Sequence, residues 1–542
     1  MFRLGILHPR VCQHLPKAYT TKRSRRISAS IAILLALLTW SLRDHIPVFP
    51  GGDKEASGDK AKLARPQVYY GPANSIAVLP FTCTSLGFEA GSGDSPANES
   101  ANESVNETGG APALADGIAE SLIDLLAGIP GLQVTSSNSS FFFRDKDAAL
   151  PVLAERLKVR HILGGCASKT AGGIEISARL FDVKAKTEKW SKSFKGKLDE
   201  VFAFQDDVTA AAANVVVSGL AKEAPEARVI DPQAWLLFIE GRYRYRLRGP
   251  ENLRQAETAF RRVLDIEPEF APVMLGLGRV YMDPVMVTTQ GRAGIERARE
   301  LILGALRLDP ELAGAYLELS RIRRTVDWDW QGSSEAAQKA LEFQAGNADV
   351  LSNASTTLFT LGKFEQAVIL LMEAIKRDPL VLQNLQRLGL LYEFSGKYEE
   401  ALSAYRLLLG LNPDYPAVHA YRSRAMLAAS MPESALEEAE KEQNPFWQRY
   451  ARILSLIALE RRDEADSLLQ QMIIEHGNDA AYQVAEIYAF GGDAGEAFNW
   501  LDRAYRQRDG GMSELIGNYF LSNLENDVRW GELLTRVSLT EP

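Results

Sequence analysis

The sequence predicts an α+β/α multidomain protein: a transmembrane helix near the amino terminus, then a small α/β sandwich domain, then an all-α superhelical solenoid. Three observations predict it. An apolar run follows a basic start, short strand and helix patterns alternate over the next part of the chain, and the second half repeats one helical pattern. The length of 542 residues suffices for two or three packed domains of roughly 100–200 residues each.

The start of the chain carries a membrane signal. Residues 1–43 hold eight Lys and Arg and no acid, so the rest of the chain carries −17 within a total of −9. Residues 27–42 are sixteen uncharged residues between Arg26 and Arg43. This length is just under the usual minimum of ~17, but the flanking arginines can snorkel and Trp40 can lie in the interface. A cleaved signal peptide and an organelle transit sequence stay open as alternatives to the favoured anchor.

The charge around this run also predicts orientation. The excess of Lys and Arg on its amino-terminal side places 1–26 in the cytoplasm as a short basic segment, with 27–42 as the transmembrane helix. We expect 43–74 to be a flexible linker, because Gly, Pro and charges mix there without a period. Everything after about residue 44 then lies outside the cytoplasm.

An α/β pattern fills 75–220, interrupted by an acidic insertion at about 84–112 that we expect to be disordered. The element order βαβαββα predicts a compact α/β sandwich. The insertion holds three N-x-S/T triplets, at Asn98, Asn102 and Asn106, but a solvated acidic loop is favoured over glycosylation. We expect strands over 76–81, 132–135, 160–168, 174–180 and beyond a turn at 184–187, and helices over 113–129, 150–157 and about 199–220.

Six blocks of this stretch carry a resemblance, among them SIAVLPF, LADGIAESLIDLLAGIPGLQVTS, LAERLKVRHILGG and IEISARLFDVKAKTEKWSKSF. In their order they resemble the TolB-amino-terminal-like domain, which precedes tetratricopeptide repeats in many bacterial membrane-bound signalling and regulatory proteins. The resemblance implies a single-pass protein of the bacterial inner membrane with its bulk in the periplasm. The acidic insertion and the pair Cys83 and Cys166 depart from the family pattern.

From residue 231 onward the sequence is helical and periodic. Asp/Asn/Glu-Pro pairs end at Pro268, Pro310, Pro379 and Pro413, and Ala345 stands in the same phase. The intervals are therefore 42, 35, 34 and 34 residues, the first with an insertion near 285–291. A period of 34 is that of the tetratricopeptide repeat, a pair of antiparallel helices. The sequence thus predicts a solenoid over 231–510.

Packing chemistry agrees with this period. Small residues at Gly389 and Ala401 let two helices cross closely, while Tyr392 and Tyr405 fill the groove beside them. We count about eight helical hairpins, closed by a C-terminal cap at 511–542 that resembles the cap of the same TolB-like group.

The opposite side of each first helix supplies the binding candidates, because tetratricopeptide arrays take up extended or helical peptides in a concave groove. Chaperone-tail-binding members use a clamp of Lys, Asn and Arg, but Leu317, Arg321 and Gln383 occupy three of its five places, so we predict no carboxylate-tail ligand. For any single residue a solvated polar groove is the favoured interpretation. The candidates are Ser352, Asn353, Thr356, Phe359, Gln383, Gln386, Arg387, Leu390, Glu393 and Phe394.

Two further motifs are better explained by structure than by ligands. Arg242, Arg244, Arg246 and Arg248 alternate with apolar and aromatic residues, but a helix spreads them around its axis, which favours a solvated helix end over a phosphate site. The tryptophans of the motif DWDW, at 328 and 330, lie in a hairpin turn, where packing between neighbouring repeats is favoured over ligand stacking.

Cys83 and Cys166 both follow predicted strands in the exported part. If these strands are neighbours, the oxidising compartment favours a disulfide, but two free thiols stay open and are slightly favoured.

No catalytic constellation is present in the sequence. The six histidines are scattered, and no nucleophile elbow, phosphate-binding Gly-Lys-Ser/Thr loop, C-x-x-C or H-E-x-x-H motif occurs, so we predict no enzyme activity, cofactor or metal. The acidic balance disfavours nucleic acid. Related chains sometimes carry a cyclase or DNA-binding domain before the membrane, and the 26 residues here are too few for either.

The sequence therefore predicts a scaffold that binds an unidentified protein, with self-association left open. The alternative is a sensor subunit whose α/β domain binds a ligand or envelope component and signals to a separate cyclase or transcriptional regulator. An enzyme with an unrecognised site is a third possibility.

Overall fold

The computed structural model describes residues 71–83, 86–87, 110–129, 131–144, 146, 148–170, 173–197, 200–216 and 230–539. All of them belong to the second of two compact units, Leu63–Pro542. The predicted anchor at 27–42, nearly all of the predicted linker and most of the acidic insertion lie outside the described residues. Within the described ranges, no helix combines the length and the apolar character needed to cross a membrane.

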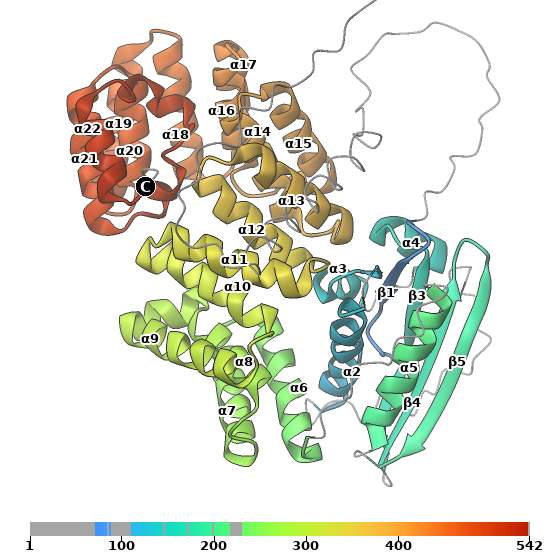
Figure 1. Cartoon of the computed structure of the whole chain (residues 1–542). Coiled ribbons are helices and arrows are strands. Elements are labelled where there is room, and N and C mark those ends of the chain that lie inside the picture. The colour runs from blue at the N-terminus through green and yellow to red at the C-terminus, as the bar shows by residue number, and fades with distance from the viewer. Residues whose placement is uncertain are drawn as a thin grey trace, which may run out of the picture. The chain divides into compact units, whose positions relative to one another are not determined.

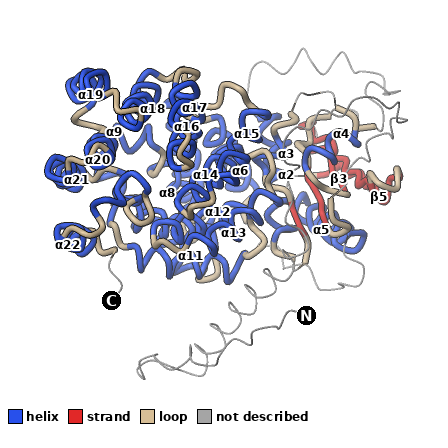
Figure 2. The backbone as a smooth tube through the Cα atoms, turned by 90° about the horizontal axis from the view of Figure 1, so that it is seen from above, coloured by secondary structure: helices blue, strands red, loops and turns tan. Residues whose placement is uncertain are grey.

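A small mixed sheet forms the centre of the α/β domain (Figures 1 and 2). Its order is β2-β1-β3-β4-β5, in which β1 pairs with β2 and β3 in parallel and β4 is antiparallel to both its neighbours. The predicted alternation along β4 is present, since Ile174, Ile176, Ala178 and Leu180 are buried. The strands are β1 (Ser75–Val78), β2 (Gln133–Val134), β3 (His161–Thr170), β4 (Gly173–Asp182) and β5 (Thr187–Gly196).

Helices cover both faces of this sheet. On one face α2 (Gly110–Ala127) and α5 (Val201–Val216) pack against the inward residues of β1, β3 and β4. On the other face α4 (Leu150–Leu157) packs against residues such as Ile162 and Phe181. A short helix, α3 (Ser137–Phe141), was not predicted. Asp116 lies beyond the first turn of α2 and is 1% exposed.

Eight helical hairpins follow, as the sequence period predicts (Figure 1). The predicted insertion lengthens α9, whose backbone leaves helical geometry at Gly291. The hairpins are α6 (Pro232–Leu247) with α7 (Pro250–Ile266), α8 (Ala271–Tyr281) with α9 (Pro284–Leu308), α10 (Ala313–Ile322) with α11 (Trp330–Gln344), α12 (Ala348–Thr360) with α13 (Phe364–Arg377), α14 (Leu382–Phe394) with α15 (Tyr398–Leu411), α16 (Val418–Ala428) with α17 (Pro432–Ala439), α18 (Pro445–Ala458) with α19 (Arg462–His476), and α20 (Ala481–Phe490) with α21 (Ala494–Gln507).

Close helix crossings hold each hairpin together. A Cβ atom at Gly389 would collide with the ring of Tyr405, so only glycine allows α14 and α15 to approach as they do. In the third hairpin the hydroxyl of Ser333 donates to the backbone oxygen of Ser320, 3.0 Å away. Small residues thus set the crossing distance at the positions where the period places them.

The end of the chain returns to the third hairpin. After α21 come two 3₁₀ turns, η4 (Gly510–Glu514) and η5 (Tyr519–Leu524), and α22 (Val528–Arg536). The indole of Trp330 donates to the backbone oxygen of Val537, and the ring of Trp328 lies 5.7 Å from that of Tyr505. The tryptophans do pack, as predicted, and the partners seen here are far along the chain: Tyr505 on α21 of the last hairpin and Val537 after α22.

Candidate functional site

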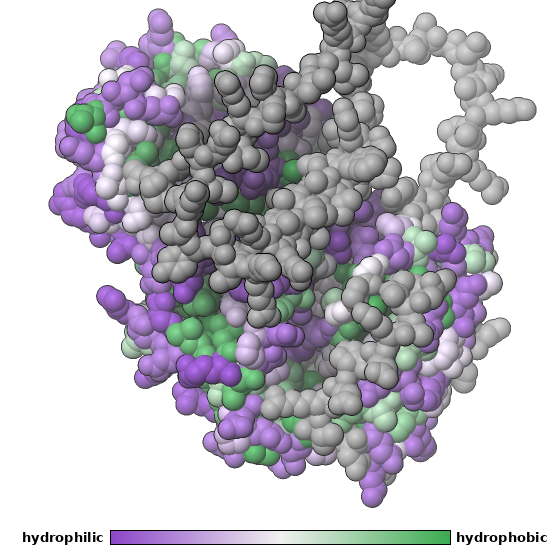
Figure 3. Space-filling model, in the orientation of Figure 1, coloured by the Kyte–Doolittle hydropathy of each residue, from purple (hydrophilic) through white to green (hydrophobic). Residues whose placement is uncertain are grey.

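The candidate site lies on the first helices of successive hairpins. We call "inner face" the side of these helices that carries Arg279 (α8), Arg321 (α10), Asp349 and Ser352 (α12), Arg387 and Glu393 (α14), and Arg424 (α16). On the face drawn in Figure 3, outside the grey atoms, hydrophilic residues predominate and apolar ones form small patches between them.

Hydrogen bonds join the polar candidates across three hairpins. Ser352 donates to Asn384 at 2.8 Å and accepts from the Arg387 guanidinium at 3.0 Å, while Asn353 accepts from Ser320 at 3.0 Å. Thr356 donates to the backbone oxygen of its own helix. Of the predicted site residues, Ser352 and Asn353 on α12 and Arg387 on α14 therefore lie on the first helices of neighbouring hairpins, and Arg387 contacts Ser352 directly. Gln383 is exposed, and Thr356, Gln386 and Leu390 are half-buried on the same helices.

The aromatic candidates lie inside the protein. Phe359 and Phe394 pack edge to face with their ring centroids 4.9 Å apart, and Phe364 joins them. Gly517, from the segment between η4 and η5, lies against Phe364, and its neighbour Ile516 lies against Gly362. The expectation that Phe359 and Phe394 line an open groove is corrected here, because the chain's own C-terminal segment covers this part of the inner face.

Glu393 is also interior and belongs to a buried ionic network. It is 2% exposed and pairs at 3.1 Å with Arg424, which is 4% exposed. Arg424 also pairs with Glu486 at 3.0 Å and donates to the Tyr450 hydroxyl at 2.6 Å. From the C-terminal segment Asn518 donates to Glu486 at 2.8 Å.

The electrostatics of this network are compensated. Burial opposes the charge of Arg424, but Tyr450, Glu486, Glu393 and Glu514 raise its pKa well above the usual value. Burial raises the pKa of Glu514 to about 7, although Arg424 acts to lower it. One guanidinium thus faces three carboxyl groups, of which Glu514 is the one supplied by the C-terminal segment.

A second arginine cluster lies nearer the start of the array, where compensation is incomplete. Arg321 pairs with Glu318 at 2.8 Å, and Glu318 is shared with Arg279 at 3.0 Å. Within the described residues Arg324 makes no ion pair or hydrogen bond, and its Nε atom is buried. Burial, together with Arg387 and Arg321, lowers the pKa of Arg324 to about 10, so it remains charged at neutral pH.

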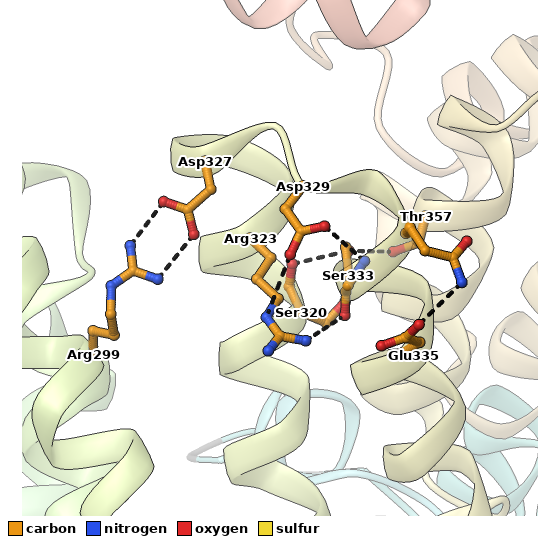
Figure 4. A network of polar contacts seen from close by, with 10 residues as sticks. Arg299, Ser320, Arg323, Asp327, Asp329, Ser333, Glu335 and Thr357 are labelled. Atoms are coloured by element: carbon orange, nitrogen blue, oxygen red, sulfur yellow. Dashed lines mark hydrogen bonds and ion pairs between the residues drawn. The ribbon is translucent and has the colours of Figure 1, made fainter. Parts of the chain in front are cut away.

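The backbone that carries Arg324 is a single π-helical turn, η3 (Arg323–Asp327), at the end of α10. Figure 4 shows how its neighbours hold it. Asp327 accepts two bonds of 2.8 Å from Arg299 of α9, and Arg323 donates to the backbone oxygen of Gly332 at 2.8 Å. Such turns are rare and occur often at functional sites. This one is fixed on both sides by charged groups.

The array is joined to the α/β domain by a charged contact. Arg246 of α6 pairs with Asp116 and Glu120 of α2, and Arg242 pairs with Glu120 and Asp124, both at 2.8 Å. The prediction of a solvated helix end for the arginine series was therefore wrong for these two. The signal was available: acids at 116, 120 and 124 and arginines at 242 and 246 each repeat every four residues on one helical stripe.

A second contact joins the domain to the middle of the array. Ser136 donates to the Asp378 carboxylate, and the hydroxyl of Ser139 accepts from the backbone N–H of Leu380 at 3.1 Å. Burial raises the pKa of Asp378 to about 6, against the hydrogen bonds from the two serines.

Cys83 and Cys166 form a disulfide in this structure. The isolated antiparallel bridge between Thr82 and Cys166 places the segment after β1 beside β3. Among the described residues, no group of three His, Cys, Asp or Glu side chains is arranged to hold a metal ion.

The tetratricopeptide repeat family matches residues 348–379 and 382–415, which are the hairpins α12/α13 and α14/α15 with their flanks. The chain therefore contains tetratricopeptide repeats, and proteins built from this repeat are protein-interaction scaffolds.

A relative described as putative adenylate cyclase 3, from Rhizobium meliloti (strain 1021), is 29% identical over 172 residues, which are 31% of this chain. The chain spans only 29% of that relative's length. Among solved structures, Pseudomonas aeruginosa PilF is 22% identical, with a TM-score of 0.33 over 41% of this chain and 98% of its own. A tetratricopeptide repeat protein from Parabacteroides merdae is 15% identical, with a TM-score of 0.36 over 49% of this chain and 98% of its own. TM-scores this low do not establish a shared overall fold.

Proposed function

We propose that this chain is a non-enzymatic, membrane-anchored scaffold of the bacterial envelope that binds a partner protein along the inner face of its tetratricopeptide array. The observation that carries the proposal is the stretch of inner face on α10, α12 and α14. There Arg387 is bonded to Ser352, and Asn353 accepts from Ser320, the residue before Arg321, while the C-terminal segment covers the later part of α12 and α14 around Phe359 and Phe394. Side chains of this kind pair with the backbone and polar groups of a polypeptide.

The membrane part of the proposal rests on other observations. In it, residues 27–42 cross the inner membrane with 1–26 in the cytoplasm, and a TolB-amino-terminal-like α/β domain and the array lie in the periplasm. The basic residues before the apolar run support this orientation. The disulfide between Cys83 and Cys166 supports it too, since disulfides persist in oxidising compartments.

A site-specific photo-crosslinker tests partner binding. It is placed at Gln383, exposed on α14 at the inner face, and in a matched control at Glu399, exposed on α15. In intact cells we expect one protein to be crosslinked at 383 and not at 399. The same adducts from both positions, or none from 383, would contradict partner binding at the inner face.

Reporter fusions test the topology. Alkaline phosphatase, which is active only after export, is fused after residue 70 or after residue 26. We expect activity from the fusion at 70 alone. A cytosolic reporter that fluoresces when fused at 70 would contradict the anchor.

A second candidate is a sensor subunit whose α/β domain binds a ligand and signals to a separate cyclase or regulator. The similarity of 172 residues to a putative adenylate cyclase favours it, as does the charged contact between α2 and α6, which can transmit a change. A small molecule that raises the melting temperature of the full chain, with no protein captured at Gln383, would favour the sensor over the scaffold.

A further inference from the structure

We propose that Arg321, Arg324 and Arg387 form a recognition site for an acidic segment of a polypeptide, whose Asp or Glu carboxylates complete the charge balance of the inner face. This inference rests on the proposed function and deepens it, because it states the chemistry of the partner. The three arginines stand on α10, η3 and α14, and Arg387 is linked through Ser352 to the helix between them.

The ion pairs show which arginines lack a carboxylate partner. Arg279 and Arg321 share Glu318, whereas Arg387 is bonded to the Ser352 hydroxyl and Arg324 makes no ion pair among the described residues. Glu318 already serves two arginines. The acids of the nearby α2 form their ion pairs with other arginines, since Asp116, Glu120 and Asp124 pair with Arg144, Arg242 and Arg246.

Donor atoms also lack acceptors. The Nε atoms of Arg321 and Arg324 are both buried without a hydrogen-bond partner among the described residues. A buried donor left without an acceptor destabilises the protein, and a guanidinium donor most of all. Guanidinium groups bind carboxylates through paired N–H donors in one plane, so an incoming carboxylate satisfies both the charge and the donors.

The same inner face shows which occupant it accepts. Arg424 stands at the position of its hairpin that Arg321 occupies in the third, directly after a serine whose side chain contacts the second helix of the hairpin. At Arg424 the charge is balanced by the carboxylates of Glu393 and Glu486, and the 3₁₀ segment η4, laid against the array, brings the Glu514 side chain near the same network. The contact at Arg424 is therefore an example, within this chain, of a polypeptide segment with acidic groups bound at the inner face.

The spread of the groups favours a polypeptide over a single small anion. The arginines lie on α10 with its η3 turn and on α14, with α12 between them, and the axes of packed helices are about 8–10 Å apart. The exposed amide of Gln383 lies on α14 beside them and suits an extended backbone. A lone phosphate would satisfy the guanidinium groups but leave this amide without a role.

The experiment uses the full chain in detergent and a fluorescein-labelled peptide with four glutamates between Gly-Ser spacers. Its glutamine counterpart and inorganic phosphate are tested in parallel. We expect the glutamate peptide to bind and the glutamine peptide not to bind. Arg324→Gln and Arg387→Gln should each weaken binding about tenfold, which corresponds to about 1.4 kcal/mol. Arg406→Gln, which removes an exposed arginine of α15, serves as the matched control and should leave binding unchanged.

Several results would overturn the inference. They are equal binding of the two peptides, equal loss in the 324 and 406 variants, or no binding of the glutamate peptide at low salt. Binding of phosphate without binding of the peptide would assign the site to a phosphoryl group instead. If the crosslinker at Gln383 captures a partner whose binding does not change in Arg324→Gln, the scaffold function stands and only this inference fails.

Discussion

Arg424 and Arg321 occupy the same position of their hairpins, but the chain's own carboxylates neutralise them to different extents. The difference divides the inner face into two halves. Arg424 is buried among Glu393, Glu486 and Glu514, with the C-terminal segment laid over it. Arg321 has one shared acid, and its neighbour Arg324 has none among the described residues. One half of the inner face is therefore structural, and the other half carries charge that the described chain does not neutralise.

The largest expected effect is the loss of stability in Arg424→Met. The change removes a buried charge and leaves Glu393 and Glu486 buried without their partner, which costs about 3–5 kcal/mol in the free energy of unfolding. Chemical denaturation monitored by circular dichroism measures it. The matched control is Arg461→Met, an exposed arginine whose one ion pair among the described residues is with Glu464, and it should give no measurable change.

If Arg424→Met leaves stability unchanged, the two halves do not differ as described. Arg424→Lys keeps the charge but loses the paired donors, so its loss should lie between those of the wild type and the Met variant. This variant also covers the case in which Arg424→Met fails to fold.

How far the sequence could predict these regions depends on whether the deciding interaction is local. The hairpins, the α4 helix at 150–157 and the alternation along β4 follow from patterns within about 34 residues, and each is present. The contact between Trp330 and Val537 spans 207 residues and depends on how the array curves, which no local pattern specifies.

The site shows the same division. Ser352, Asn353 and Arg387 were predicted because the repeat period assigns them to one side of their helices. Arg324 was missed because it stands on a π-helical turn, where the period of the preceding helix no longer applies. Phe359 and Phe394 were expected to be exposed in the groove, because the sequences of their own repeats contain no signal for the distant segment around Gly517 that covers them.

The covered half should respond to pH through Glu514. Its pKa is about 7 in the folded protein against 4.5 as the ordinary value, so the folded state holds this proton more tightly than the unfolded state. The resulting stability is fully present below pH 4.5 and is lost as the pH rises through about 7. The wild type should therefore lose stability between pH 5 and pH 8 relative to Glu514→Gln, which cannot titrate.

Denaturation midpoints of the two proteins at both pH values measure this difference, and the comparison removes the contributions of every other titrating group. Asp378, with a pKa of about 6, has the same sign and remains present in both proteins. If the difference in stability between the two proteins does not change with pH, Glu514 is already ionised at pH 5 in the folded state. The description of the network around Arg424 would then be wrong at Glu514.

The smallest effect is expected in the uncovered half, and it separates a recognition residue from a structural one. Arg324→Gln removes a charge that Arg321 and Arg387 repel and that has no partner among the described residues. Since nothing is left unpaired by the change, the free energy of unfolding should stay within about 0.5 kcal/mol of the wild type, or rise slightly. The matched comparison is Arg299→Gln, which breaks the paired bonds to Asp327 and should cost more. A loss at 324 as large as that at 424 would mean that Arg324 supports the fold, and the two halves of the inner face would then be alike.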